Sequence, residues 1–218
     1  MGGRGQGGGE IGGGSNFSNG LNPYGDLSQI TLEDAIGTQG DPKSMADAFY
    51  EANPYFSRLY DDYSSNCQRC VMAYEMRRRG YDVIALPTYD GDQMPHGNNM
   101  YAALGNIVPE KVGGRNPESN FKNIESKMKE WGEGSRAILE VAWRNYMGRG
   151  HVINLEYKNG ALHFYDAQDG NREIGVPALK QTLRDAKPRH TAIVRTDTAT
   201  VTEDMKYMVT TKRISNLS

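Results

Sequence analysis

Two thiols, one imidazole and one carboxylate are the side chains of this sequence whose types and spacing point to chemistry. Cys67 and Cys70 lie close together, and His151 and Asp166 lie further along the chain. A thiol becomes a nucleophile when it ionises, and a histidine that is oriented by a third group can accept its proton. The set predicts a cysteine nucleophile that is assisted by a histidine and an aspartate.

The segment that carries both thiols predicts a helix. Within residues 67–79, Cys70 and Tyr74 fall at helical intervals, a Ser or Asn in front can act as the N-cap, and Gly80 ends the run. Cys67 is therefore expected at the N-terminus of the helix, where the helix dipole and unpaired backbone N–H groups favour a thiolate. Cys70 lies one turn further in, on the expected core side, and remains the alternative nucleophile.

A hairpin signal explains how the histidine and the carboxylate would meet. Residues 151–157 and 161–166 read as β-strands, and the Asn-Gly pair that joins them is typical of a tight hairpin turn. His151 begins the first strand and Asp166 ends the second. The hairpin therefore brings the two side chains together.

The rest of the chain predicts helices first and then a mostly antiparallel sheet, which is an α+β layout. Further helices are expected over residues 42–52, 121–132 and 176–186, and from about Glu203 onward. Further strands are expected within 81–87, at 136–144 beside the hairpin, and at 190–197. Residues 61–66 and 88–100 read as loops.

Composition argues against several classes of protein. The chain has 218 residues and a formal net charge of −2, which suits one domain and argues against nucleic acid as the main partner. No apolar stretch approaches the roughly 18 residues of a membrane span. The basic run Arg77-Arg78-Arg79 reads as the solvated end of a helix. Two cysteines are too few for a structural zinc site on their own, and the four histidines show none of the short spacings that zinc sites typically use, so no metal is expected.

The beginning of the chain predicts a flexible tether. Residues 1–25 hold 11 of the 26 glycines and almost nothing that a core could bury. We therefore divide the chain into a tether over residues 1–40 and a folded domain over residues 41–218. Such a tether suggests that the domain is the C-terminal module of a longer protein.

Three blocks of the sequence resemble the papain-fold toxin family called Tox-PL or papain fold toxin 1, which are proposed protein-glutamine deamidases. The blocks are NCQRCVMAYEMRRRGYDVIALP, GHVINLEYKNGALHFYDAQDG and VRTD, and the resemblance covers roughly residues 54–210. It implies a papain-like cysteine hydrolase fold. Domains of this family sit at the C-termini of bacterial polymorphic toxins and of some phage head-morphogenesis proteins.

The resemblance also implies roles for single residues. Cys67 matches the nucleophile of the family's NC motif, and His151 matches the histidine of its GH motif. Asp166 and Gln168 match its D-x-Q motif, in which this chain has Ala167 where the family often has proline. The second thiol, Cys70, is the one that aligns tolerably with the nucleophile of papain itself.

These observations predict a thiol-dependent amidohydrolase whose substrate is the side-chain carboxamide of a glutamine. His151 would activate Cys67 and protonate the leaving group, and Asp166 would orient His151. The oxyanion would be held by the backbone N–H of Cys67 together with the amide of Asn66 or Gln168. This chemistry requires no metal or organic cofactor.

Two alternatives to a deamidase stay open at this point. The same three side chains support peptide cleavage or acyl transfer, so a papain-like cysteine peptidase or an acyltransferase is the first. The second is a non-catalytic structural module of a phage particle or secretion system, for instance with its site capped by the loop at residues 88–100.

The family also implies partners and a location. We expect a protein substrate in the cytoplasm of a target cell and a cognate immunity protein. A larger delivery or phage protein, of bacterial or phage origin, would carry the domain there by secretion or injection.

Overall fold

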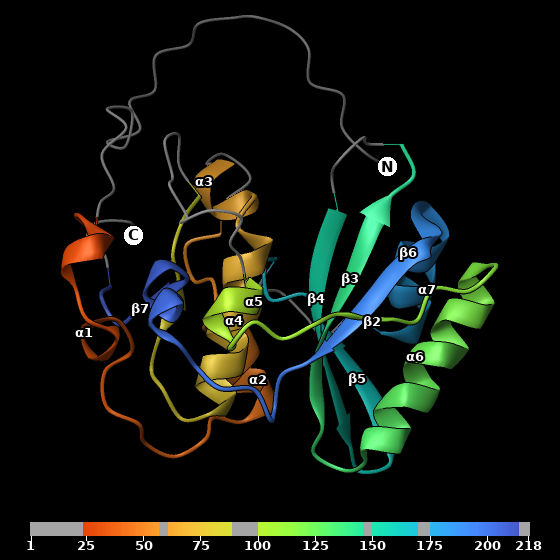
Figure 1. The fold of residues 1–218 in the computed structure, drawn as a ribbon, viewed down its shortest axis with the longest axis horizontal. Coiled ribbons are helices and arrows are strands. Elements are labelled where there is room, and N and C mark those ends of the chain that lie inside the picture. The colour runs from red at the N-terminus through yellow and green to blue at the C-terminus, as the bar shows by residue number, and fades with distance from the viewer. Residues whose placement is uncertain (1–23, 57–60, 89–99, 146–149, 170–174, 214–218) are drawn as a thin grey trace, which may run out of the picture.

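A computed structural model describes residues 24–56, 61–88, 100–145, 150–169 and 175–213, and the structural statements that follow concern these residues. A five-stranded antiparallel sheet stands at the centre, with helices on both faces (Figure 1). Helix α4 packs on one face, whereas helices α6 and α7 cover the other. The α+β class predicted from the sequence is confirmed.

The strand order of the sheet is β2-β6-β3-β4-β5. The strands are β2 (Glu110–Lys111), β3 (Arg136–Trp143), β4 (Gly150–Lys158), β5 (Ala161–Tyr165) and β6 (Ala186–Arg195). The predicted three-stranded meander is present as β3, β4 and β5. Its hairpin turn has φ values of 54° at Asn159 and 72° at Gly160, as a tight turn of this kind requires.

Helices α6 (Pro117–Trp131) and α7 (Val176–Asp185) confirm two of the predicted helices. Helix α6 begins earlier than expected because Asn116 caps it through the backbone N–H of Ser119 and Pro117 suits the first turn. The two helices bury Ile124, Met128, Leu179 and Leu183 against the sheet. This packing forms one of the two large apolar clusters of the core.

Helix α4 (Cys67–Arg78) lies at the centre of the other large cluster, together with α2 (Met45–Tyr50) and α5 (Met100–Ala103). Every residue from Arg69 to Arg77 is buried, so this helix has no solvated face. Burial on all sides holds the helix in place relative to the sheet, and with it the thiol at its first residue.

The region after the large sheet differs from the prediction. A helix was expected from Glu203, but the structure has a short 3₁₀ helix, η2 (Glu203–Tyr207), followed by strand β7 (Val209–Thr210). Strand β7 pairs with β1 (Ile84–Ala85), which confirms a strand within residues 81–87. Pairing with β1 requires extended backbone at Val209, and this ends the helical turn.

The predicted boundary at residue 40 is too late. Residues 24–37 contain η1 (Leu27–Gln29) and α1 (Leu32–Ile36), and α1 begins with a reciprocal cap between Thr31 and Asp34. Apolar side chains of this segment are buried, namely Tyr24, Leu27, Ala35 and Ile36. The segment is therefore part of the folded domain, whereas residues 1–23 lie outside the described part.

Residues 61–66, which were read as a loop, begin with the short helix α3 (Asp61–Ser64). Most of the expected loop at residues 88–100 lies outside the described residues. Among the helices that the structure describes, none has the length and apolar character needed to cross a membrane.

Candidate active site

Cys67 occupies the first position of helix α4 and is half-buried. The backbone carbonyl of Asn66 accepts the N–H groups of Arg69 and Cys70, and this closes the first turn. The earliest N–H groups of a helix have no partner within it, so they are available at this end. The prediction of a cysteine at a helix N-terminus is confirmed.

His151 and Asp166 meet as the hairpin predicts. The His151 Nε2 atom lies 2.8 Å from Oδ2 of Asp166, and the exposed fractions of the two side chains are 15% and 24%. The other carboxylate oxygen, Oδ1, accepts the backbone N–H of Gln168 at 3.3 Å. The Asp166 carboxylate is thus fixed by the turn on one side and holds the imidazole on the other.

The residue before the histidine must be a glycine. A Cβ atom on Gly150 would lie 2.3 Å from the backbone oxygen of Val141, which is closer than any real contact. The absent side chain lets β4 approach β3 at this point and pairs His151 with Val141. The indole of Trp143 stacks on the imidazole, with ring centroids 6.2 Å apart and planes 17° apart.

The electrostatics of His151 favour the charged imidazolium. Burial opposes the charge, but hydrogen bonds to Asp166 and Cys67, together with the charges of these groups, raise the pKa of His151 to about 10. Nε2 bonds to Asp166, which leaves Nδ1 free of that contact. Cys67 and His151 line the same cleft, and Asp166 holds the imidazole beside it.

Cys70 has a different environment. Its side chain is fully buried, and its thiol donates a hydrogen bond to Oδ1 of Asn66 with a 3.1 Å separation. Burial is the main cause that raises the pKa of Cys70 well above the ordinary value, and the nearby Cys67 and Asp166 add to it. A neutral thiol inside the core is a poor nucleophile. The geometry favours Cys67 over this alternative.

Asn66 does not present its amide to the site. Its Nδ2 atom donates to the carbonyl of Leu86 at 3.0 Å and to Oδ1 of Asn53 at 3.3 Å, and the residue is buried. It also makes no side-chain capping bond to helix α4. The proposed oxyanion role of Asn66 is therefore not supported, because both of its amide protons are used inside the fold.

Gln168 lies beside Asp166. It is half-buried, and its backbone carbonyl accepts a hydrogen bond of 2.9 Å from Nδ2 of Asn53. The same Nδ2 atom donates to the carbonyl of Tyr63 at 3.0 Å. Asn53 therefore ties the turn after Asp166 to the segment that leads into α4. No local pattern in the sequence predicts this role of Asn53, because its contacts are long-range.

A cleft of about 230 Å³ opens at the thiol. Its lining comes from α4, α5, β3 and the start of β4, and comprises Cys67, Gln68, Met100, Tyr101, Glu140, Val141, Gly150, His151 and Val152. Glu140 and Tyr101 were not predicted from the sequence. Their juxtaposition spans 39 residues of chain and follows no motif. Within the described ranges, no group of three or more His, Cys, Asp and Glu side chains is arranged to hold a metal ion.

Comparison with known families agrees with this geometry. Residues 65–171 match the family described as papain fold toxin 1, glutamine deamidase. Over this segment the chain is similar to that family. The match includes Cys67, His151, Asp166 and Gln168, and the helices packed on an antiparallel sheet agree with a papain-like fold. No curated protein matches the chain.

The folded papain-like unit extends beyond the matched segment. Strand β6 lies after residue 171, yet it pairs with β3 along most of its length inside the large sheet. Helix α1 lies before residue 65, yet it packs against η2 and β7. The family segment thus carries the site, and the flanking residues complete the core around it.

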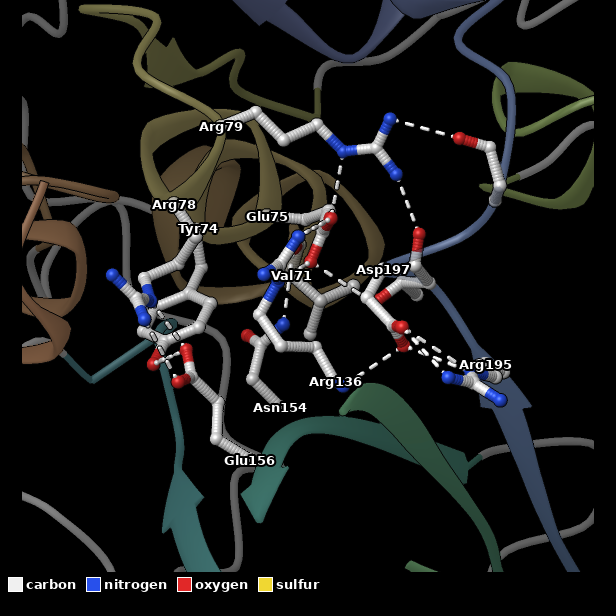
Figure 2. Close-up of polar contacts among 12 residues, drawn as sticks. Val71, Tyr74, Glu75, Arg78, Arg79, Arg136, Asn154, Glu156, Arg195 and Asp197 are labelled. Atoms are coloured by element: carbon white, nitrogen blue, oxygen red, sulfur yellow. Dashed lines mark hydrogen bonds and ion pairs between the residues drawn. The ribbon is translucent and has the colours of Figure 1, made fainter. Parts of the chain in front are cut away.

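Buried ion pairs dock helix α4 of the papain-like unit onto the sheet (Figure 2). Glu75, whose side chain is 1% exposed, binds Arg136 of β3 at 2.8 Å and Arg79 at 2.7 Å. The hydroxyl of Thr196 donates to the same carboxylate at 2.9 Å. Burial alone would raise the pKa of Glu75, but the two guanidinium groups outweigh it and lower this pKa.

A second ion pair docks the same helix onto β4. Arg78 binds the buried carboxylate of Glu156 at 2.5 Å, and the Tyr74 hydroxyl donates to that carboxylate at 2.8 Å (Figure 2). Arg77 is also buried and pairs with Asp82 at 2.7 Å. The interpretation of the arginine run as a solvated helix end is therefore wrong. The buried carboxylates of Glu156 and Glu75 pair with Arg78 and Arg79, and backbone carbonyls accept further hydrogen bonds from Arg77 and Arg79.

Proposed function

We propose that this domain is a protein-glutamine deamidase in which Cys67 is the nucleophile. The observation that carries the proposal is the arrangement at the cleft: Cys67 and His151 line it together, and His151 is held by Asp166. The family match to glutamine deamidases supports the same reaction.

The first half-reaction would form a thioester. The Cys67 thiolate attacks the carbon of the glutamine carboxamide, so that a C–S bond forms and the carbonyl oxygen becomes an oxyanion. As the oxyanion collapses, the C–N bond breaks and the His151 imidazolium gives its proton to the departing nitrogen, which leaves as ammonia. The stacking of Trp143 and the bond to Asp166 keep the imidazole aligned through this transfer.

The second half-reaction would release the acid. Neutral His151 takes a proton from water, the resulting hydroxide attacks the thioester, and the C–S bond breaks to regenerate the Cys67 thiolate. The product is a glutamate side chain. In both steps we place the oxyanion at the N-terminus of α4, where the backbone N–H of Cys67 is available, with Gln168 as the candidate second donor.

The size of the cleft supports a protein substrate that inserts one side chain. Its volume of about 230 Å³ is smaller than the roughly 300–1,000 Å³ of typical small-molecule sites. A single glutamine side chain needs less room than a cofactor or metabolite. The rest of the target would then lie on the surface around the cleft.

The biological setting belongs to the same proposal. The toxin family suggests a bacterial effector that acts inside a target cell. We extend this to a domain that a larger delivery or phage protein carries into the target-cell cytoplasm, and that a cognate immunity protein restrains in the producing cell.

Mass spectrometry of candidate host proteins, incubated with the domain in isotopically labelled water, tests the reaction. We expect one glutamine per target to become glutamate with label in the new carboxyl oxygen, and Cys67→Ala to abolish this. Cleaved chains would indicate a peptidase instead, and new amide links would indicate an acyltransferase. If the candidate proteins stay unchanged although the domain is folded, and if Cys67 carries no adduct from a substrate, the result would favour a non-catalytic module.

A further inference from the structure

Glu140 and Tyr101 form a polar wall in the cleft that the proposed triad does not use. Glu140 lies on β3, next to Val141, and pairs with Val152 of β4. Tyr101 comes from helix α5, and its hydroxyl donates a short hydrogen bond to Oε1 of Glu140. Both side chains are half-buried and line the same cleft as Cys67 and His151.

This pair can offer a ligand hydrogen-bond acceptors but no donors. A tyrosine hydroxyl has one proton, and Tyr101 gives it to Glu140. What remains for a ligand is the second carboxylate oxygen of Glu140 and a lone pair on the Tyr101 oxygen, and both are acceptors. No lysine or arginine occurs among the described residues that line the cleft. A ligand that satisfies this wall must therefore bring N–H or O–H donors.

A carboxamide and a carboxylate differ in this respect. The carboxamide of glutamine brings two N–H donors on a neutral group, whereas the carboxylate of glutamate brings acceptors and a negative charge. Burial raises the pKa of Glu140, although the Tyr101 hydrogen bond opposes the shift, so water screens this carboxyl only in part. An acceptor that is poorly screened discriminates strongly between the two groups.

We propose that Glu140, positioned by Tyr101, selects the substrate carboxamide over the product carboxylate by accepting a hydrogen bond from the amide nitrogen. This inference rests on the proposed function, since it assigns the substrate's NH2 group to this wall while Cys67 attacks the carbon. The same carboxylate repels the glutamate product after hydrolysis. Glu140 is thus a specificity residue for the amide and assists release of the acid.

Two alkylating reagents test this assignment without any turnover. Iodoacetamide and iodoacetate modify a thiolate in the same way, with loss of iodide, but one carries a carboxamide and the other a carboxylate. The readout is the ratio of their rates at Cys67, normalised to the ratio for free cysteine and measured in the Cys70→Ala background. Glu140→Gln keeps the shape of the side chain and removes its charge.

We expect Glu140→Gln to lower this normalised ratio about tenfold, the effect of losing one charge-assisted hydrogen bond. Tyr101→Phe, which leaves the charge but removes the positioning hydroxyl, should lower it by a smaller factor. The matched control is Glu125→Gln, an exposed residue of α6 on the opposite face of the sheet, which should leave the ratio unchanged. A ratio that stays at the wild-type value in folded Tyr101→Phe and Glu140→Gln overturns the assignment. If only Tyr101→Phe folds, its unchanged ratio does so alone.

The experiment separates this inference from the proposed function. A fall in the ratio without deamidation of any protein would retain the carboxamide pocket and reject the deamidase. An unchanged ratio in an active deamidase would reject the role of Glu140 alone. With an active enzyme, a peptide that carries glutamate should inhibit Glu140→Gln more strongly than the wild type, and equal inhibition contradicts the proposal.

Discussion

At the scale of single residues, the proposed chemistry depends on the charge of the His151 imidazole. His151 is held between a carboxylate and a thiol inside a largely desolvated corner, and its pKa rises to about 10. A charged imidazolium stabilises the thiolate as an ion pair and carries the proton that ammonia needs. We therefore assign the role of nucleophile to Cys67, which lines the cleft with His151, whereas burial raises the pKa of the Cys70 thiol within the core.

The two thiols should separate cleanly by mutation. We expect Cys67→Ala to abolish deamidation, by at least about a thousandfold, with little change in stability, because it removes the nucleophile from a half-buried position. Cys70→Ala should retain activity and lose about 1–2 kcal/mol of stability, since it deletes a buried group. Urea unfolding and ammonia release measure the two effects. Equal loss of activity in two equally stable variants would contradict the choice of Cys67.

Asp166→Asn should change the pH dependence of stability. The pKa of His151 rises from 6.5 to about 10 on folding, so the charged pair stabilises the fold fully below pH 6.5 and loses this contribution as the pH rises through 10. We expect the variant to be less stable than the wild type by about 1.5–3 kcal/mol near pH 6, with the difference shrinking toward pH 10. Urea unfolding at several pH values measures this. A difference that is independent of pH would show that Asp166 only forms the turn.

At the scale of elements, the site depends on how one helix and one hairpin are docked. Local sequence predicts both elements, because the helical spacing of residues 67–79 and the Asn159-Gly160 turn are short-range signals. It also predicts the meeting of His151 with Asp166, since a hairpin folds back on itself. The docking contacts were not predictable in this way. Glu156, the partner of Arg78, lies 78 residues along the chain, and a run of arginines looks the same on a solvated face.

The sequence-based predictions that were wrong failed for the same physical reason. The amide of Asn66 turns inward because Asn53 and Leu86 accept its hydrogen bonds. Both partners lie too far away in the sequence to form part of a local motif. The expected helix after Glu203 stops because β7 pairs with a strand that precedes it by more than a hundred residues. Glu140 was not recognised as a site residue for the same reason.

The buried carboxylate of Glu75 should contribute strongly to the docking of α4. Glu75→Ala removes the partner of Arg136 and Arg79 and leaves two guanidinium groups poorly compensated in the interior. We expect a loss of about 3–5 kcal/mol in the free energy of unfolding, measured with urea. Glu125→Ala, at an exposed position of α6, is the control and should change it by less than about 0.5 kcal/mol. A loss as small as that of the control would show that the ion pairs add nothing to the docking.

At the scale of the whole molecule, segments near the two ends of the described chain pack against each other. Helix α1 packs against η2 and β7, and Lys206 donates a hydrogen bond of 2.9 Å to the carbonyl of Ile30. Helix α1 therefore packs against the segment that follows the large sheet and that pairs with β1. The glycine-rich composition predicts a tether over residues 1–40, whereas residues 24–37 contribute buried side chains to the core and residues 1–23 lie outside the described part.

Two truncations should distinguish the tether from the folded segment. Removal of residues 1–23 should leave the melting temperature unchanged within about 2 °C, because ten of these residues are glycine and few can be buried. Removal of residues 1–40 strips Leu27 and Ile36 from the core and should cost about 3–6 kcal/mol at roughly 1.5–3 kcal/mol for each aliphatic side chain. Calorimetry of both proteins measures the difference. A shorter truncation as damaging as the longer one would contradict this boundary.

The sequence separations of the site contacts also set an order in time. His151 and Asp166 are 15 residues apart, whereas the contacts of Glu75 with Arg136 and of Tyr74 with Glu156 close loops of 61 and 82 residues. Longer loops cost more entropy to close and slow the search for native contacts. During refolding we therefore expect the imidazole to meet its carboxylate before the thiol arrives. With Trp131→Phe, the fluorescence of Trp143, which stacks on His151, should recover ahead of the selective alkylation of Cys67. A newly made chain would then pass through a stage in which its proton carrier is assembled and its nucleophile is still absent.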